Sequence, residues 1–521
     1  MSVSVLDTTL RDGAQAEGIA FSLEDKRAII RALDALGITY IEAGQPASNP
    51  KDAALFQALP PMSNAVICAF GSTRHKNTCT EEDVGLRALC ESGAQTAVIF
   101  GKSDTLQVRN ILKCTREENL AMISESVAFL KAHGLRVIFD AEHFFDGWRR
   151  DEDYAMQTLS AAQAAGADIL TLCDTRGGTM PDDAFRITQT VCERFPGQVG
   201  VHFHNDCGVA AANTDLAVLA GATHVQGTFL GFGERCGNAS LATVIPNLQL
   251  KRGYACIPEE QMGNLYETAH RIADIANLSI PRGMPYVGRS AFAHKAGTHA
   301  DAVLKQATSY EHIAPELVGN HRKVLLSEIS GQSALLPKIN RVAHVERNSA
   351  AARAIAKKLK ELELRGYQFE AAEASFELLV RKQLGMYQSF FELVGFKTIG
   401  EQAAKNNQSA SAIVHVMVDG KSEMTAAAGD GPVHAIDGAL RKALEVFYPS
   451  LRAVHLIDYK VRVLDHAQAT AARVRVLITS SDGAHVWSTV GVSTDIIEAS
   501  LSALIDSIEY KLILDQEAKQ K

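Results

Sequence analysis

Two histidines in the run HFHND, which begins at His202, are the residues of this sequence best placed to do chemistry. His202 and His204 stand two positions apart, so a strand here would point both imidazoles to the same side. The apolar residues Val199 and Val201 come just before His202, and polar residues follow His204. This pattern indicates a buried strand that opens at its carboxyl end. Paired imidazoles are good ligands for a divalent metal ion. A pair of packed, hydrogen-bonded histidines is the alternative, and the motif alone leaves both open.

The elements that must position these histidines follow a regular rhythm. Short apolar runs with polar ends recur about every 25 to 40 residues, and amphipathic stretches such as 116–133 and 151–165 lie between them. This alternation is typical of a parallel sheet covered by helices. Counting the runs favours a (β/α)8 TIM barrel over an open, doubly wound sheet, since no GxGxxG motif follows the first strand. The expected strands are Ser4–Leu10, Thr39–Gly44, Ala65–Phe70, Thr96–Phe100, Arg136–Glu142, Asp168–Asp174, Val199–Asp206 and His224–Gly231.

The carboxyl ends of these expected strands carry many ionisable side chains. In a TIM barrel those ends converge on one face, where catalytic residues lie. Asp12 follows the first strand, and His202 and His204 lie at the end of the seventh; both strands flank the eighth where the barrel closes. This placement strengthens the metal-site hypothesis, with Asp12 as a third ligand. The other polar residues at or just past strand ends are Arg11, Glu42, Glu142, His143, Asp174, Thr175, Glu234, Arg235 and Asn238.

Composition argues against several classes of protein. The chain has 521 residues and a net charge of −8, without a basic tract, so neither nucleic acid nor an anionic membrane is expected as a partner. Its nine cysteines are scattered and form no CxxC pair, which indicates reduced thiols in a cytoplasmic protein. The N-terminus lacks the pattern of a signal peptide, and no apolar run approaches the ~20 residues that cross a bilayer.

The barrel rhythm stops after about Ile275, and two further regions follow. We expect residues 1–275 to form the catalytic barrel, 276–385 to form helical linker subdomains, and 386–521 to form an α+β domain. In the last region the pattern predicts two copies of a strand–strand–helix unit. Such a module senses a ligand, mediates dimerisation or is only structural, and the residues alone leave these alternatives open.

A set of motifs gives the chain a resemblance to a known family. The motifs are LDTTLRDGAQ, IEAGQPASNPKD, FDAEHFFDG, HFHND and GFGERCGNA. Together they resemble the acyl-CoA-condensing branch of the metal-dependent TIM-barrel lyases, which includes the 2-isopropylmalate, homocitrate and citramalate synthases. The segments SAFAHKAGTHADAVL and TSYEHIAPELVGN and the C-terminal region look most like the long type of (R)-citramalate synthase. The resemblance covers nearly the whole chain, and its motifs are specific only in combination.

This resemblance implies a cofactor and a catalytic set. The cofactor would be a divalent metal ion, Zn²⁺, Mn²⁺ or Mg²⁺. Arg11 would contact the substrate carbonyl, and Glu142 would lie near the methyl group that loses a proton. His299 and Tyr310 would contribute to catalysis from the linker, at the active site of the partner subunit. The implied metal ligands are Asp12, His202, His204 and Asn238.

The resemblance also implies residues that bind the substrate, namely Arg11, Gln15, Glu42 and Thr175, with Thr175 holding a carboxylate. For Glu42 the residues leave three interpretations: a catalytic group, a group that orients Arg11, or an ordinary buried ion pair. We favour the second interpretation, because a buried carboxylate needs a partner.

The activity implied by the resemblance is that of an acyltransferase in which the acyl group becomes an alkyl group. Acetyl-CoA and pyruvate would undergo a Claisen-type condensation and thioester hydrolysis to give (R)-citramalate and CoA, for isoleucine biosynthesis. The alternatives are a condensation with another 2-oxo acid, as in 2-isopropylmalate or homocitrate synthases, a metal-dependent aldolase or lyase, and a non-catalytic amino-acid sensor. A homodimer and an isoleucine effector at the C-terminal domain are also implied. Gln45 and Arg176 depart from the expected aromatic residue and asparagine, which bears on the choice of 2-oxo acid.

Overall fold

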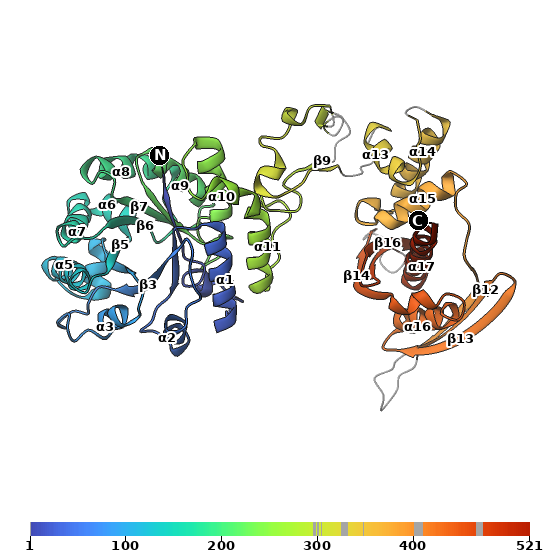
Figure 1. Ribbon diagram of the computed structural model, residues 1–521, viewed down its shortest axis with the longest axis horizontal. Helices are drawn as coiled ribbons and strands as arrows, with labels where there is room; N and C mark the ends of the chain where they lie inside the picture. The colour runs from blue at the N-terminus through green and yellow to red at the C-terminus, as the bar shows by residue number, and fades with distance from the viewer. Residues whose placement is uncertain are drawn as a thin grey trace. The chain divides into compact units, whose positions relative to one another are not determined.

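The computed structural model describes residues 2–294, 299, 302–303, 305–324, 332–346, 349–400, 410–464 and 472–520. Contacts divide the chain into two compact units, the first with residues 1–292 and 313–322 and the second with residues 293–312 and 323–521. Figure 1 labels the helices and strands of both units. None of the helices in the described ranges has the length and apolar content needed to cross a membrane.

The first unit contains a closed barrel of eight parallel strands, which confirms the predicted (β/α)8 fold. Strand β1 pairs with β2 on one side and with β8 on the other, so the sheet closes on itself. At the closure Ser4 lies opposite His224, and Asp7 lies opposite Gly227. An open, doubly wound sheet is therefore wrong for this chain. The strands are β1 (Ser4–Asp7), β2 (Tyr40–Gly44), β3 (Val66–Ser72), β4 (Thr96–Lys102), β5 (Arg136–Glu142), β6 (Ile169–Asp174), β7 (Val199–Phe203) and β8 (His224–Gly227).

Helices connect the strands around the outside of the barrel (Figure 1). Ser22 and Asp25 form a capping box at the start of α1, and Gly37 ends that helix with a φ of 85°. The helices are α1 (Leu23–Leu36), α2 (Pro50–Gln57), α3 (Val84–Glu91), α4 (Thr105–Gln107), α5 (Arg116–Ala132), α6 (Phe144–Arg150), α7 (Glu152–Ala164), α8 (Pro181–Arg194), α9 (Ala210–Leu219), α10 (Leu241–Pro246) and α11 (Leu265–Ile275). Short 3-10 or π turns are η1 (Gly13–Gln15), η2 (Val108–Leu112), η3 (Asn247–Lys251), η4 (Glu259–Asn264) and η6 (Pro315–Val318).

Apolar side chains fill two separate regions of the barrel. A large cluster that includes Val5 lies between the strands and the helices. A smaller cluster, which includes Leu6 and Ile138, has the opposite strand parity and fills the interior. Two residues beyond Ile138 the next inward position is Asp140, so the interior turns polar toward the carboxyl ends of the strands. This polar end of the interior carries the candidate site.

In the described part of the second unit, short elements and three helices precede two copies of one motif. Each copy has three antiparallel strands and a helix, so the predicted duplication is confirmed, but its unit is larger than strand–strand–helix. Sequence patterns missed β11 because it contains Gly395 and Gly400, and β13 because alanines occupy 426–428; both residue types are uncommon in strands. The elements are β9 (Ala293–His294), η5 (Ala307–Ser309), β10 (Lys323–Val324), α13 (Gln332–Val342), α14 (Ala350–Leu364), η7 (Phe369–Ala371), α15 (Glu373–Gln383), β11 (Glu392–Gly400), β12 (Ala410–Val418), β13 (Lys421–Gly429), α16 (Pro432–Leu444), η8 (Pro449–Ala453), β14 (His455–Val463), β15 (Val474–Ser481), β16 (Val486–Ser493) and α17 (Ile496–Gln520).

One face of the β11–β13 sheet packs on α16, and its side chains alternate between that face and the opposite one. In β12, Ala412 and Val414 are fully buried, whereas Ile413 between them is 37% exposed. Met424 lies opposite His415 in the strand register, on the same face as Ile413, and is 63% exposed. The face away from α16 therefore presents apolar side chains.

Candidate active site

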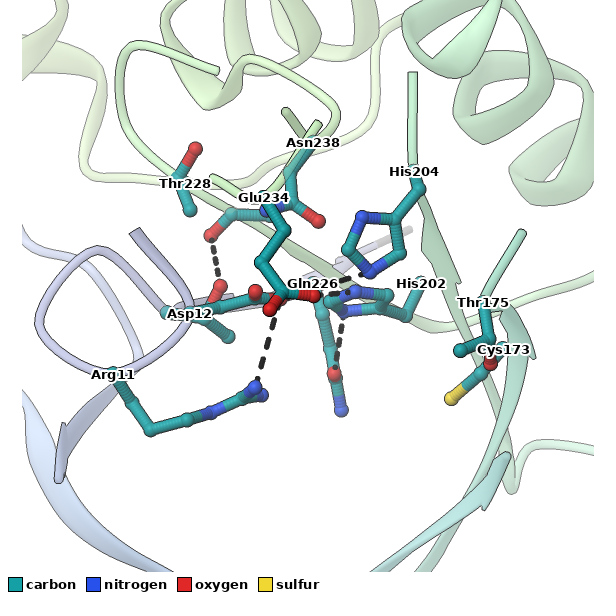
Figure 2. A network of polar contacts seen from close by, with 12 residues as sticks. Arg11, Asp12, Cys173, Thr175, His202, His204, Gln226, Thr228, Glu234 and Asn238 are labelled. Atoms are coloured by element: carbon teal, nitrogen blue, oxygen red, sulfur yellow. Dashed lines mark hydrogen bonds and ion pairs between the residues drawn. The ribbon is translucent and has the colours of Figure 1, made fainter. Parts of the chain in front are cut away.

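Three buried side chains meet at the carboxyl end of the barrel, where it closes. The Nε2 atoms of His202 and His204 lie 3.3 and 4.0 Å from the same Oδ2 atom of Asp12. One ligand atom from each of the three residues lies within 4.8 Å of the other two. Asp12 is 2% exposed, His202 is 5% exposed and His204 is 8% exposed. Figure 2 shows both imidazoles directed toward the carboxylate. The first and seventh strands thus bring these three side chains to one point.

The loop after β8 folds back over the end of β7 and brings a fourth residue to this cluster. The Asn205 N–H donates to the Gly237 carbonyl at 2.8 Å, and the Asn238 N–H donates to the Gly231 carbonyl at 2.9 Å. Asn238 then pairs with His204 in an isolated β-bridge. These main-chain bonds hold the Asn238 side chain beside the imidazoles, as Figure 2 shows.

Asn238 has a buried oxygen atom that suits a cation. Its side chain is 2% exposed, and within the described part of the chain its Oδ1 atom has no hydrogen-bond partner. Leaving such an oxygen unpaired costs about 1–3 kcal/mol, which coordination to a cation would offset. The four residues offer one carboxylate, two imidazoles and one amide oxygen. Zn²⁺, Mn²⁺ and Mg²⁺ accept such ligands. The four residues therefore fit a divalent metal ion.

The charges of the cluster also suit a cation near neutral pH. Burial would raise the pKa of Asp12, but Arg11 and His202 together hold it well below its usual range. Burial and the neighbouring His202 lower the pKa of His204 to about 4, so this ring is neutral. Burial would also lower the pKa of His202, but its hydrogen bond with Asp12 outweighs that effect and raises it. Asp12 thus draws positive charge to this point, and a bound cation would replace the proton on His202.

Gln226 on β8 holds the ring of His202 from the side away from Asp12. The Nδ1 atom of His202 lies 3.1 Å from Gln226 Oε1, which only accepts, so the ring nitrogen donates. The Gln226 amide group donates in turn to Asp140 Oδ1 at 2.8 Å and to Thr171 Oγ1 at 3.1 Å, which fixes its orientation. With a proton on Nδ1, the neutral ring presents an unprotonated Nε2 atom, which is the tautomer that a metal ligand needs.

Arg11 lies beside the cluster, with its guanidinium group fixed by neighbours. Its Nε donates to Glu42 Oε2 at 2.6 Å, and its guanidinium carbon lies 3.8 Å from the centre of the Phe70 ring. Glu42 is fully buried, and burial raises its pKa to about 7 although Arg11 opposes this shift. Glu42 lies outside the lining of the adjacent cavity. Glu42 therefore contacts Arg11 as the favoured interpretation requires, and its implied role in binding the substrate stays a prediction.

A cavity of about 250 Å³ opens beside Arg11 and the cluster. Glu142, at the end of β5, lines it and forms an ion pair with Lys102 at the end of β4. Thr175 lines the cavity from the end of β6, whereas Gln45 and Arg176 do not line it. The lining residues are Arg11, Asp12, Gln15, Phe70, Phe100, Asp140, Glu142, Cys173, Thr175, His202, His204, Glu234 and Arg235.

His299 and Tyr310, the linker residues implied for catalysis, lie in the second unit. Their rings stack with centroids 4.3 Å apart and an interplanar angle of 30°. Both side chains are exposed. The first unit alone carries the cation cluster, Arg11 and Glu142, and the catalytic roles of His299 and Tyr310 stay predictions.

Sequence analysis did not single out several residues that shape the site. Asp140 lies two positions before Glu142, so strand periodicity from that polar end would have found it, and Phe100 is the last residue of its expected strand. Gln226 carries no such signal, because a neutral amide within an apolar run has no distinctive chemistry until its neighbours are known.

Replacing Gln226 by leucine removes the acceptor for His202 Nδ1 and keeps a side chain of similar size. We expect the affinity for Mn²⁺ or Zn²⁺ to fall about 10- to 100-fold, because the ring of His202 would lose its fixed tautomer and orientation. Calorimetric titration of the full chain with each metal measures this change. The matched control is Gln163→Leu, since Gln163 pairs with Gln198 at an exposed site on the outside of the barrel. Unchanged affinity in a folded Gln226→Leu protein would contradict the role assigned to Gln226.

Known families match consecutive parts of the chain. Residues 2–275 match the HMGL-like family, and residues 286–366 match the homocitrate synthase post-HMGL domain-like family. Residues 370–512 match the LeuA allosteric (dimerisation) domain. The first match spans the strands of the barrel, and the third spans both three-stranded sheets of the second unit.

Individual proteins match the chain over nearly its full length. The (R)-citramalate synthase of Aquifex aeolicus is 50% identical over 99% of this chain and 98% of its own. The probable 2-isopropylmalate synthase of Methanopyrus kandleri is 32% identical over 97% of each chain. Among solved structures, the hydroxymethylglutaryl-CoA lyase of Pseudomonas aeruginosa is 22% identical, with a TM-score of 0.46 over 54% of this chain and 94% of its own. The chain therefore belongs to the HMGL-like family and, within it, to the group formed by the (R)-citramalate synthases.

Proposed function

We propose that this chain condenses acetyl-CoA with pyruvate and hydrolyses the resulting thioester, so that the two substrates and water give (R)-citramalate and CoA. The observation that carries the proposal is one cavity lined both by the cluster of Asp12, His202 and His204 and by Glu142. Relatives named (R)-citramalate synthase, 42% to 50% identical over nearly the whole chain, support pyruvate as the 2-oxo acid. A place in isoleucine biosynthesis is part of the same proposal.

A divalent metal ion held by Asp12, His202, His204 and Asn238 belongs to this proposal. When bound, such an ion polarises a carbonyl group and stabilises the negative charge that develops on its oxygen. The chain prepares the position by keeping Asp12 ionised and His204 neutral, as their shifted pKa values indicate. The ligand set accepts Zn²⁺, Mn²⁺ or Mg²⁺.

Arg11 supplies a fixed positive charge next to the cluster. Glu42 holds its Nε, and Phe70 covers one face of the guanidinium group. We assign the terminal nitrogens of Arg11 to the keto oxygen of the 2-oxo acid, where negative charge forms as the new carbon–carbon bond closes. A donor fixed in advance stabilises that charge more than a mobile one, because it does not have to reorganise during the reaction.

Glu142 is our candidate for the general base. Its carboxylate would take a proton from the methyl group of acetyl-CoA, and the resulting carbon nucleophile would attack the ketone. The ion pair with Lys102 holds the Glu142 carboxylate in the cavity wall, and Lys102 itself lies 5.5 Å from the centre of the Phe100 ring. On the strength of the family resemblance, His299 is assigned to the same proton transfer beside Glu142, and Tyr310 is assigned to catalysis from the linker.

The cavity also suggests how a small 2-oxo acid is selected. Thr175 and Gln15 are assigned to its carboxylate, from the ends of β6 and β1. The methyl group of pyruvate is assigned to the apolar wall of Phe70 and Phe100, whose stacked rings lie 5.5 Å apart. A longer side chain would have to displace one of these rings, and each methylene is worth about 1–3 kcal/mol of discrimination.

The second unit is assigned to assembly and regulation. Residues 370–512, which match the LeuA allosteric (dimerisation) domain, include the β11–β13 sheet with its apolar outer face. We propose that this face takes part in a homodimer, since an apolar sheet face exposed to water is a common interface. Isoleucine is the proposed effector of the same module.

Assays of CoA release with a panel of 2-oxo acids test the proposed activity. We expect turnover with pyruvate to exceed that with 2-oxobutyrate, 2-oxoisovalerate and 2-oxoglutarate, because the cavity wall favours a methyl group. We also expect isoleucine to inhibit the pyruvate reaction more than leucine does. Preference for 2-oxoisovalerate would instead support a 2-isopropylmalate synthase, and no CoA release with any 2-oxo acid would favour a lyase.

Replacing Glu142 by glutamine removes the proposed base and keeps the shape of the side chain. We expect kcat to fall about 10²- to 10⁴-fold, with metal affinity unchanged, because Glu142 lies outside the ligand set. Steady-state kinetics with pyruvate measures this loss. The matched control is Glu91→Gln on the outer helix α3, where the side chain is 71% exposed. Full activity of the Glu142→Gln protein would exclude Glu142 as the base.

Replacing Ile413 by aspartate places a charge on the apolar face of the β11–β13 sheet. We expect the chain to shift from dimer toward monomer, because burying an unpaired carboxylate in an interface is unfavourable. Light scattering coupled to gel filtration measures the change in mass. Leu364→Asp is the control, since Leu364 is 85% exposed at the end of α14 and lies outside the sheet. An unchanged mass for Ile413→Asp would place the interface elsewhere.

A further inference from the structure

Three consecutive loops at the carboxyl end of the barrel carry residues of the candidate site. Thr175 lies in the loop after β6, His204 begins the loop after β7, and Asn238 lies in the loop after β8. The three strands are neighbours in the barrel, and in Figure 2 Thr175 and Asn238 lie on either side of His204. The cation cluster and the residue assigned to the substrate carboxylate therefore depend on how these loops are held together.

One side chain, Arg235, contacts all three loops. It belongs to the loop after β8 and stands three residues before Asn238. Its Nε donates to Asp206 Oδ1 at 2.8 Å, and its Nη2 donates to Asp206 Oδ2 at 3.1 Å, on the loop after β7. The same Nη2 donates to the Thr175 carbonyl at 2.9 Å. We call these contacts of Arg235 with Asp206 and Thr175 the arginine bridge. A guanidinium group paired with a carboxylate through two nitrogens has a fixed orientation.

The backbone of Arg235 has a conformation that needs an explanation. Its φ is 56°, in the left-handed region that residues other than glycine seldom adopt. Such a conformation persists where the surrounding contacts determine it, and it is frequent at functional sites. The adjacent Glu234 does not supply that contact, because its side chain is 54% exposed and lies 3.7 Å from Arg235 Nη1. The arginine bridge accounts for the conformation.

Asp206 is confined on the side away from Arg235. The loop after β6 packs against it so closely that a Cβ on Gly177 would lie 2.3 Å from Asp206 Oδ2. The Cys207 N–H donates to the Gly177 carbonyl at 3.2 Å, which joins the main chains of the two loops. Asp206 therefore offers Arg235 a fixed point of attachment, and the position of Arg235 is set from outside its own loop.

We propose that Arg235 is a positioning residue, whose bridge holds Asn238 and Thr175 where a divalent metal ion and the carboxylate of a 2-oxo acid both need them. This inference rests on the proposed function for the identity of the carboxylate. The positive charge of Arg235 cannot favour a cation directly, because like charges repel. Any benefit of Arg235 to metal binding therefore comes from the placement of the loops.

Titration of the full-length protein with Mn²⁺ tests this assignment through the sign of the change. Removal of a positive charge would by itself raise the affinity for a cation. In Arg235→Ala we expect the affinity to fall about tenfold or more, as it does when a residue that orients metal ligands is lost. Arg235→Lys should show the same fall, because an ammonium group lacks the planar fork that reaches both loops.

The matched control for this titration is Arg149→Ala. The Nε and Nη2 atoms of Arg149 also donate to one aspartate, Asp183, but they do so between the outer helices α6 and α8. We expect the control to keep the Mn²⁺ affinity of the unchanged protein. An unchanged or raised affinity in Arg235→Ala overturns the proposal. So does an affinity restored in Arg235→Lys, or an equal loss in the control.

A second substitution, Asp206→Ala, tests the bridge from the other loop. The double variant Asp206→Ala with Arg235→Ala should bind Mn²⁺ about as weakly as Arg235→Ala alone, because both substitutions break the same contacts. Losses that multiply would show that the two residues act separately, and they would overturn the proposal.

The titrations contain no substrate, so they separate this inference from the proposed activity. Loss of Mn²⁺ affinity in Arg235→Ala, in a chain that releases no CoA with any 2-oxo acid, would refute the proposed activity and support the bridge. Equal affinity with and without Arg235 would refute the bridge even where CoA is released. In the active protein at saturating Mn²⁺, Arg235→Ala should raise the KM for pyruvate more than that for acetyl-CoA, because Thr175 is assigned to the pyruvate carboxylate. Equal increases would overturn the link to Thr175.

Discussion

A negative charge held inside the barrel at Asp12 is the constraint on which the rest of the site depends. Moving an isolated carboxylate out of water costs several kcal/mol, so Asp12 is stable there only with positive charge around it. Arg11 lies on one side of it, and His202 and His204 lie on another. Since these partners come from the two strands that flank β8, the electrostatics of the site and the closure of the barrel support each other.

Buried polar groups behind Asp12 are ordered by the same principle. Glu42 and Asp140 are both buried, and burial raises the pKa of each carboxyl group. Each has a specific donor, Arg11 for Glu42 and Gln226 for Asp140. Because these donors also contact Asp12 and His202, the positions of the charged groups at the cavity are set by a connected layer of hydrogen bonds. The reacting end of the barrel therefore gains its rigidity from polar contacts, and the other end gains it from apolar packing.

Periodicity was enough to predict the barrel and the central cluster, because Asp12 and His204 each lie just past an apolar run and parallel topology brings those ends together. It was not enough for Gln226, whose role depends on a neighbour in the adjacent strand. Lys102 likewise became meaningful only when the register of β4 and β5 placed it beside Glu142. In the second unit, the glycines of β11 and the alanines of β13 kept the sequence pattern from indicating these two strands. They are strands because they pair with a neighbour in the sheet.

Closure of the barrel through β1 and β8 has a consequence for biosynthesis. Asp12 leaves the ribosome early, whereas His202, His204 and Asn238 emerge only after most of the barrel has been translated. Until then the nascent chain is an open sheet, with a free edge on β1 and a carboxylate that lacks its imidazole partners. Free strand edges in partly folded chains promote aggregation. In the interval of translation between Asp12 and Asn238, a partly folded barrel would therefore expose the edge of β1 that β8 covers in the finished structure.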